Sequence, residues 1–368
     1  MMSTKLFSLP VCCILLITVG CGHKVDVSTA FSFPVETVKS FAERTSISST
    51  MSEWAATQYE HAACDSLIVS FEPRESFLFS LTDLRTGDLI GTYCHKGRSD
   101  QEPLDILPHF VPYVEEGEFK IDFLSYPRAK VFSWNVTRSC RENTTEYDAI
   151  ITLYPEPSEE FTPRSFFILD ENVVLVLNSR QNLYAEGESD TVPVWEVYDS
   201  VSGELIRTFE LFKPGEYLKE ASEAFSRQSF FSSKESIKPD HTLVVSAMQS
   251  IPQINIIDPY SGDAHGILFG SSQIDTNKPK AYFYDVKCDD RFIYALYLGE
   301  KWEKADDNPQ SWVYVLDWNG KPLTKFRAGN ATGLFLDKST LYLTNYMHST
   351  LSSVDLRTIL PSESTGRQ

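Results

Sequence analysis

Runs of apolar and β-branched residues recur along the chain, and several end in an aspartate that is followed four positions later by a glycine. The pattern occurs in FSLTDLRTGDLIGTY (79–93), WEVYDSVSGELIRTF (195–209) and INIIDPYSGDAHGILF (254–269). An aspartate side chain caps a tight turn through the following backbone, and glycine accepts the positive φ that closes it. Each run therefore predicts a β-hairpin.

The spacing of these hairpins indicates a repeat. Asp199, Asp258 and Asp317 are each 59 residues apart, whereas Asp83 precedes Asp199 by 116, which leaves room for one hidden unit. KVFSWNV (130–136) fills that place, with Asn135 at the aspartate position, and a truncated copy ends in SSVDL (352–356). A fixed period of this length is typical of a repeat architecture.

A second signal recurs between the hairpins, where a short acidic turn leads into an apolar run. Its six copies begin at Asp65, Glu116, Asp170, Asp240, Asp290 and Asp337. Six interleaved pairs of turns predict six four-stranded antiparallel units, which is an all-β, six-bladed β-propeller. The acidic turns could also ring the channel mouth and attract calcium, but the preference of aspartate for turns explains them better.

The repeat divides the chain into three parts. Residues 1–20 form a signal peptide, residues 21–49 a leader, and residues 50–368 one propeller domain. The C-terminal tail is too short and polar to supply the last strand of the sixth blade. We therefore expect the leader, over roughly 25–49, to close the ring as the outermost strand of that blade; a disordered leader is the alternative.

The N-terminus indicates export. Lys5 is the only charged residue among the first twenty, and the apolar stretch up to Cys21 has the length of a signal-peptide core rather than of a membrane span. TVGC (18–21) resembles a bacterial lipobox, in which Cys21 would be lipidated, although Thr18 departs from the usual aliphatic residue. We expect a lipoprotein of the outer membrane, on its periplasmic or cell-surface side. Ordinary secretion and an uncleaved anchor are the alternatives.

Cysteine and charge restrict the possible partners. Beyond the lipobox only Cys64, Cys94, Cys140 and Cys288 remain; a Cys64–Cys94 disulfide is conceivable, but buried thiols are the simpler interpretation. No cysteine or histidine spacing predicts a metal site, and no cofactor is expected. The net charge of −18 disfavours nucleic acid and anionic lipid surfaces.

The variable loops predict a binding face. In a propeller the loops between second and third strands and the crossovers between blades share one face, and here these segments are long and irregular. Arg180, Tyr184, Trp302 and His348 are the candidate binding residues on that face. Tyrosine and tryptophan stack on sugars or peptides, and arginine can hold a carboxylate, although ordinary loop packing would explain each residue singly.

Catalytic motifs are absent from the sequence. It has no Gly-x-Ser-x-Gly elbow, no His-Glu-x-x-His, no phosphate-binding glycine loop and no sialidase-type Asp box. We therefore expect a monomeric, non-enzymatic binding or scaffold module for a protein or glycan partner. The alternative is a propeller hydrolase or lyase acting on extracellular polysaccharide, which would require paired acids about 5–10 Å apart in the central funnel.

The repeats, following a lipobox, resemble the TolB-like, NHL-like six-bladed propeller lipoproteins of Gram-negative bacteria. The resemblance covers residues 50–356 and the signal. It implies the propeller fold and a periplasmic or surface location, and little about a reaction. The crossovers HKGRSDQEP (95–103) and LFKPGEY (211–217) are eroded versions of the glycine-rich crossover of that family.

Overall fold

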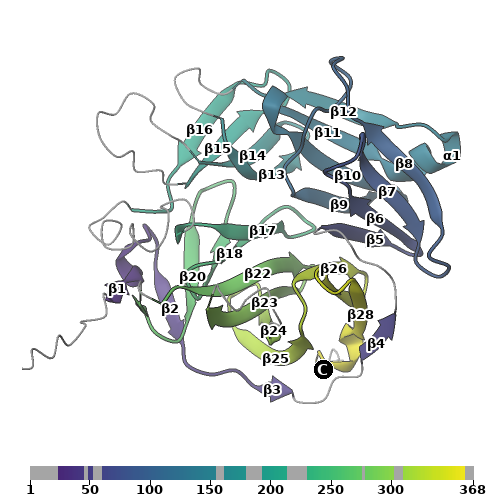
Figure 1. Ribbon diagram of the computed structural model, residues 1–368. Coiled ribbons are helices and arrows are strands. Elements are labelled where there is room, and N and C mark those ends of the chain that lie inside the picture. The colour runs from purple at the N-terminus through teal and green to yellow at the C-terminus, as the bar shows by residue number, and fades with distance from the viewer. Residues whose placement is uncertain are drawn as a thin grey trace, which may run out of the picture.

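The two recurring turns of the sequence each join a pair of antiparallel strands. The computed structural model describes residues 24–44, 49–52, 60–154, 161–179, 193–213, 230–275, 278–301 and 310–360. Within these residues six sheets surround a common axis, and each runs from an inner strand to an outer strand at the rim (Figure 1). The protein is an all-β, six-bladed β-propeller, as the repeat predicts.

The strands follow one another from the axis outward in every blade. Blade one contains β5 (His61–Cys64), β6 (Leu67–Phe71), β7 (Phe77–Asp83) and β8 (Leu89–His95). Blade two contains β9 (Phe110–Glu115), β10 (Glu118–Ser125), β11 (Lys130–Asn135) and β12 (Tyr147–Thr152), with the 3₁₀ turn η2 (Tyr126–Arg128). Blade three contains β13 (Pro163–Asp170), β14 (Val173–Ser179), β15 (Pro193–Asp199) and β16 (Leu205–Phe209).

The remaining three blades each take an additional strand from the N-terminal segment. Blade four contains β17 (Ser233–Ile237), β18 (Val244–Met248), β19 (Gln253–Ile257) and β20 (Ala264–Phe269). Blade five contains β22 (Lys280–Cys288), β23 (Phe292–Lys301), β24 (Ser311–Asp317) and β25 (Pro322–Gly329). Blade six contains β26 (Gly333–Asp337), β27 (Thr340–Asn345) and β28 (Thr350–Asp355), followed by η3 (Leu356–Thr358).

The aspartate-to-glycine turns connect the third and fourth strands, and their hydrogen bonds are those that the sequence predicts. Asp199 Oδ1 accepts from the backbone N–H groups of Val201 at 3.0 Å and Ser202 at 2.6 Å. The N–H of Gly203 donates to the Asp199 carbonyl at 2.8 Å, and Gly203 has φ +75°. The side chain and the glycine therefore close the turn together.

Blade two confirms that Asn135 replaces the aspartate. Its side-chain oxygen accepts from the N–H of Arg138 at 2.8 Å, but the chain then forms a helix, α1 (Val136–Glu142), instead of a tight turn. Asparagine is as good an N-cap as aspartate, so the capping residue survives although the turn does not.

The acidic turns connect the first and second strands. Asp170 and Asp240 accept from the N–H groups two residues later, at 2.8 and 3.0 Å. In blade five the sequence indicates Asp290, but Asp289 caps the turn, accepting from Arg291 at 2.8 Å and Phe292 at 2.7 Å. Asp290 lies in the same turn, as the sequence indicates, and either of the two adjacent aspartates offers the chemistry that the cap needs.

The segment before blade one, taken to Ser52 and still called the leader, closes the ring, but only its last strand does so and not the whole of residues 25–49, because the edges of two other blades bind its earlier strands. β4 (Ser49–Ser52) pairs antiparallel with β28 and completes blade six. β2 (Val35–Val38) and β3 (Glu43–Arg44) instead run parallel to the outer strands β20 and β25. β1 (Lys24–Asp26) pairs with β21 (Gln273–Asp275), in the crossover from blade four to blade five, and leads into η1 (Val27–Thr29). The N-terminal segment therefore protects the edges of three blades.

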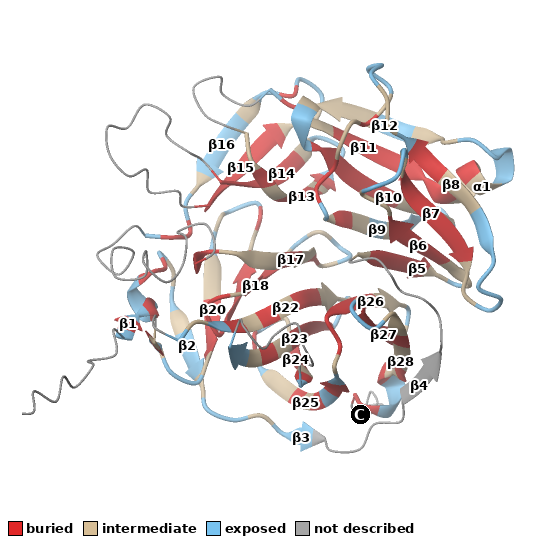
Figure 2. Cartoon of the chain, viewed as in Figure 1, coloured by how far each residue is buried: buried red, intermediate tan, exposed pale blue. Residues whose placement is uncertain are grey.

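Hydrophobic side chains fill the six gaps between neighbouring blades, where each gap holds its own cluster. Between blades one and two, Phe79 stacks on Trp134 with ring centroids 5.1 Å apart. The middle strands are accordingly the most buried (Figure 2). Full burial of such a side chain contributes about 1.5–3 kcal/mol, so blade stacking is the main source of stability.

The cysteines of the propeller are free thiols. Cys64 ends the inner strand of blade one and Cys94 lies in its outer strand, with two strands between them. Three strand spacings separate such positions by about 14 Å, twice what a disulfide tolerates between Cα atoms. A disulfide between Cys64 and Cys94, which the sequence left conceivable, is therefore excluded.

Candidate functional site

A cavity of about 630 Å³ lies on the propeller axis, enclosed by the inner strands. Its inner end reaches Glu60, just before β5, and His109, just before β9. Its mouth is lined by residues of the turns between first and second strands, namely Pro239, His241, Asp289, Asp290 and Lys338. This axial cavity thus opens on the face formed by those turns, the turn face. The opposite face carries the crossovers between blades and is the crossover face.

Four charged side chains form an ion-pair cluster at the inner end of the axial cavity. Glu60 Oε1 lies 3.1 Å from Lys234 Nζ, and Glu60 Oε2 lies 3.7 Å from Lys287 Nζ. Lys287 Nζ also lies 3.2 Å from Asp285 Oδ1. Asp285 Oδ2 accepts from the N–H of Leu334 at 2.8 Å, so this axial ion-pair cluster extends into the backbone of blade six.

The axial ion-pair cluster spans the axis. Glu60 precedes the inner strand of blade one, whereas Lys234 and Lys287 belong to blades four and five. Blades one and four are opposite each other in a ring of six, so the contact between Glu60 and Lys234 crosses the channel. The cluster therefore bridges the channel at the inner end of the cavity.

The charges of the cluster stabilise one another. Burial alone would raise the pKa of the Glu60 carboxyl, but Lys234 and Lys287 outweigh burial and lower it to about 2. Burial raises the pKa of Asp285, with Lys287 opposing. The pKa of Lys287 lies above its ordinary value because Asp285 and Glu60 outweigh the effect of burial. At neutral pH Glu60 is a carboxylate and both lysines are charged.

Two histidines of the cavity are oriented by backbone carbonyls. His109 Nε2 lies 3.3 Å from the Phe166 carbonyl oxygen, and His241 Nδ1 lies 2.9 Å from that of Leu169. A carbonyl oxygen only accepts, so these nitrogens carry the protons and the other ring nitrogens are acceptors in the neutral rings. Burial, with Lys287 next, lowers the pKa of His109 to about 4, which keeps it neutral at pH 7.

Two further ionisable side chains that line the cavity, Glu235 and Cys288, are hydrogen-bonded and shifted by burial toward their uncharged forms. Glu235 accepts from Ser246 Oγ at 3.2 Å, and burial raises the pKa of its carboxyl. Cys288 Sγ lies 3.0 Å from the Ile237 carbonyl oxygen, and burial raises the pKa of its thiol to about 12. A thiol in this state is a poor nucleophile.

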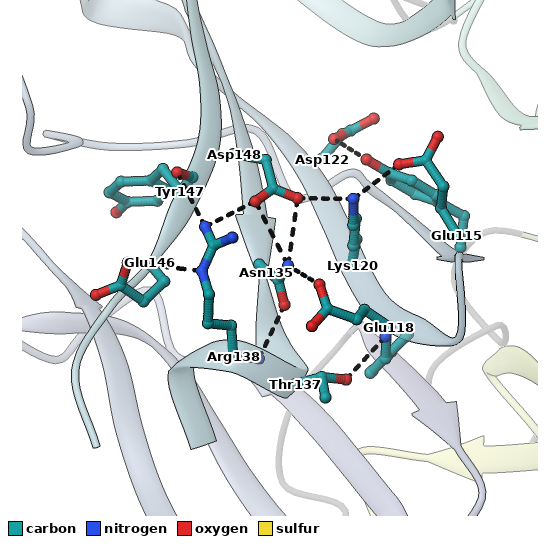
Figure 3. Close-up of polar contacts among 12 residues, drawn as sticks. Glu115, Glu118, Lys120, Asp122, Asn135, Thr137, Arg138, Glu146, Tyr147 and Asp148 are labelled. Atoms are coloured by element: carbon teal, nitrogen blue, oxygen red, sulfur yellow. Dashed lines mark hydrogen bonds and ion pairs between the residues drawn. The ribbon is translucent and has the colours of Figure 1, made fainter. Parts of the chain in front are cut away.

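A polar network in blade two adjoins the mouth (Figure 3). Lys120 Nζ lies 2.7 Å from both Glu115 Oε2 and Asp148 Oδ2, and Arg138 Nη2 lies 2.7 Å from Asp148 Oδ1. Asn135 Nδ2 donates to Glu118 at 2.6 Å. Because Glu115 also lines the cavity, the network holds one carboxylate at the mouth through a chain of contacts that reaches α1.

Sequence reasoning placed the binding residues on the crossover face. His348 lies there, exposed, in the loop between β27 and β28, and its N–H donates to Asn345 Oδ1 at 3.0 Å. Cys21, Arg180, Tyr184 and Trp302 lie outside the described residues. His348 is not among the residues that line the axial cavity.

The axial ion-pair cluster was not predicted from the sequence, although a signal for it exists. Lys234 and Glu235 in β17, and Asp285 and Lys287 in β22, are charged residues within innermost strands. Such strands line the axis, so charges inside them indicate a polar channel. In the part of the chain that the structure describes, no three histidine, cysteine or acidic residues are grouped to hold a metal ion.

Several solved structures are similar to this chain, and the first of those given below supports the fold. A member of the DUF4221 family from Bacteroides vulgatus matches with a TM-score of 0.54 and 9% identity, covering 86% of this chain and 97% of that one. A protein of Bacteroides fragilis NCTC 9343, described as exported, matches with a TM-score of 0.48 and 11% identity, covering 87% and 98%. The Neurospora crassa Pan2 WD40 domain matches with a TM-score of 0.43 and 14% identity, covering 79% and 73%.

Sequence comparison adds nothing to this assignment. No family model matches the chain, and a comparison with curated proteins finds no relative. At such low identity the similarity to solved structures defines the class, a six-bladed β-propeller, and not the activity. Among the described residues, none of the helices has the length and apolar character needed to cross a bilayer.

Proposed function

We propose that this chain is an exported, non-enzymatic binding protein, anchored through Cys21, whose axial cavity binds a positively charged segment of a partner protein. The observation that carries the proposal is the charge of the cavity. Its described lining holds five acidic side chains and two lysines; the acids are Glu60, Glu115, Glu235, Asp289 and Asp290. Glu60 and Glu115 are ion-paired with lysines, so the acidic mouth formed by Asp289 and Asp290 carries the proposal. A cavity of this composition attracts cationic groups and repels anionic ones.

The shape of the cavity supports the same proposal. Its volume of about 630 Å³ lies within the range of about 300–1,000 Å³ typical of ligand sites. The axial ion-pair cluster bridges its inner end, and its mouth opens on the turn face, where we expect a ligand to enter. A projecting loop or chain end fits such a cavity.

A polysaccharide hydrolase is the second candidate function, because one pair of acids meets the geometric requirement. Lys287 Nζ lies 3.7 Å from Glu60 Oε2 and 3.2 Å from Asp285 Oδ1. The two carboxylates are therefore within about 7 Å of each other, as in glycosidases. Binding is favoured because Lys287 lies between the two acids and Asp285 does not line the cavity. Asp285 also accepts two backbone N–H groups, at 2.8 Å each.

A peptide-binding assay tests the proposal. A fluorescent lysine-rich decapeptide should bind residues 22–368, measured by anisotropy, more tightly than a glutamate-rich decapeptide or a neutral oligosaccharide, and the binding should weaken with salt. Asp290→Asn should weaken it several-fold. Asp263→Asn is the matched control, since both aspartates are exposed turn residues but Asp263 lies at the rim.

Equal affinity for the three probes, or equal loss in the two variants, would contradict a cationic ligand in the axial cavity. Release of reducing ends from a polysaccharide by the wild type but not by Glu60→Gln would favour the hydrolase instead. The binding and hydrolysis assays, made on the wild type and the same variants, thus distinguish the two candidate functions.

A further inference from the structure

The first described strand of the chain is fixed to the crossover face. Lys24, Val25 and Asp26 pair with Asp275, Ile274 and Gln273, and the N–H of Val27 donates to the Ser272 carbonyl at 2.9 Å. The Val25 and Val27 side chains are buried in the cluster that fills the gap between blades three and four. The chain is therefore held in place from Lys24 onward.

The strand that holds β1 lies in a crossover. β21 follows β20, the fourth strand of blade four, and precedes β22, the inner strand of blade five. In an antiparallel blade such crossovers lie on the face opposite the turns between first and second strands. β1 is consequently on the crossover face, while the axial cavity opens on the turn face.

The distance from Lys24 to Cys21 is short compared with the thickness of the propeller. Three residues span at most about 10 Å when fully extended. The inner strand β22, with nine residues, is about 30 Å long. A lipid on Cys21 therefore cannot reach the turn face.

We infer that the bilayer contacts the crossover face beside blades four and five, and that the mouth of the axial cavity points away from the membrane. The inference rests on the proposed anchorage through Cys21. It adds the orientation of the protein: the partner approaches from the aqueous side, without competing with lipid for the site.

Quenching by a lipid-borne nitroxide tests this orientation. Lys278, in the crossover that carries β21, and Lys321, in the turn between β24 and β25, are both exposed lysines on the same side of the ring. Replacing either one by a genetically encoded fluorescent amino acid changes the charge equally. In vesicles of phosphatidylcholine with headgroup-nitroxide lipid, we expect the probe at 278 to be quenched and the probe at 321 to keep its vesicle-free intensity.

A second anchoring method separates this inference from the proposed lipidation. The same two probes are placed in a protein whose residues 1–21 are replaced by six histidines, on vesicles with a nickel-chelating lipid. Mass spectrometry of the N-terminal peptide reports lipidation of the native protein and its loss in Cys21→Ser. An unmodified Cys21 would contradict the proposed anchorage alone, whereas quenching at 321 equal to or above that at 278 on the nickel vesicles would overturn the orientation.

Discussion

Gly203 shows how one atom can determine whether two blades meet at the rim. It has φ +75°, and a Cβ there would lie 2.0 Å from the carbonyl oxygen of Thr152 in blade two. The adjoining backbone is also used, since the N–H of Tyr154 donates to the Gly203 carbonyl at 2.7 Å. The glycine is required both by its own turn and by the neighbouring blade.

We expect Gly203→Ala to reduce the free energy of unfolding by about 3 kcal/mol or more, since backbone strain and a backbone clash add together. Gly117→Ala is the matched control: Gly117 has φ +79°, but no atom lies within 4 Å of the position that an added methyl group would take. That variant should lose only about 1 kcal/mol. Urea unfolding measures both, and equal losses would show that the contact with Thr152 is unimportant.

The buried carboxyl of Asp122 should make the stability of the protein depend on pH. This carboxyl accepts from the Tyr113 hydroxyl at 3.2 Å, and burial raises its pKa to about 7 from an ordinary value of 3.8. The unfolded chain therefore loses this proton at lower pH than the folded protein. Between about pH 4 and pH 7 the folded state binds more protons, so the contribution of Asp122 to stability falls as the pH rises.

The free energy of unfolding of the wild type should therefore contain a decrease of at most about 4 kcal/mol between pH 4 and pH 8 that comes from Asp122. In Asp122→Asn this decrease should be absent. Asp148→Asn is the control, because Lys120 and Arg138 lower the pKa of Asp148 despite its partial burial. The control variant should keep the decrease. An Asp122→Asn profile parallel to the wild type would contradict the assignment.

Local and distant contacts differ in how well the sequence reveals them. Asp199, Asp258 and Asn135 act on backbone groups two or three residues away, so their roles were predictable. Glu60 and Lys234 are 174 residues apart and meet only because the ring closes. No local pattern encodes that contact; the charged residues of the inner strands indicate only that the channel is polar.

At the scale of elements, the leader contributes to three blades unequally. β2 and β3 are added beside outer strands that already complete blades four and five, whereas β4 supplies the fourth strand that blade six lacks. The sequence indicated the missing strand because the C-terminal tail could not provide it. The path of β2 and β3 was not predictable, since any extended segment can pair with an exposed edge.

Two truncations test this division. A protein beginning at residue 45 loses β1, β2 and β3 but keeps β4, and it should unfold cooperatively at a lower temperature. A protein beginning at residue 53 also loses β4, which leaves β28 as an open edge, and it should lose cooperative thermal unfolding. Calorimetry compares them; similar transitions in both proteins would show that β4 is dispensable for closure.

At the scale of the molecule, the axial ion-pair cluster connects blades one, four, five and six. Glu60→Gln leaves Lys234 and Lys287 with less compensation, and we expect a loss of about 3 kcal/mol at pH 7. The pKa of Glu60 is lowered from 4.5 to about 2, so its stabilisation is present above pH 4.5 and is lost as the pH falls toward 2. The difference between variant and wild type should shrink over the same range.

The double variant Glu60→Gln/Lys234→Met restores the balance of charge. Its loss of stability should be smaller than the sum of the two single losses, as a double-mutant cycle in urea would show. Additive losses, or a Glu60→Gln effect that is constant between pH 2 and pH 7, would mean that the pair across the axis does not stabilise the ring.

The order of contacts along the leader has a mechanical consequence. A pull on the N-terminus loads β1 and β21 first, then η1, β2 and β3, and reaches β4 only after these have separated. Each separation would lengthen the free N-terminal segment while β4 remains paired with β28 in blade six. With the proposed anchor at Cys21, a force from the membrane would therefore separate the N-terminal strands first and leave the axial cavity intact.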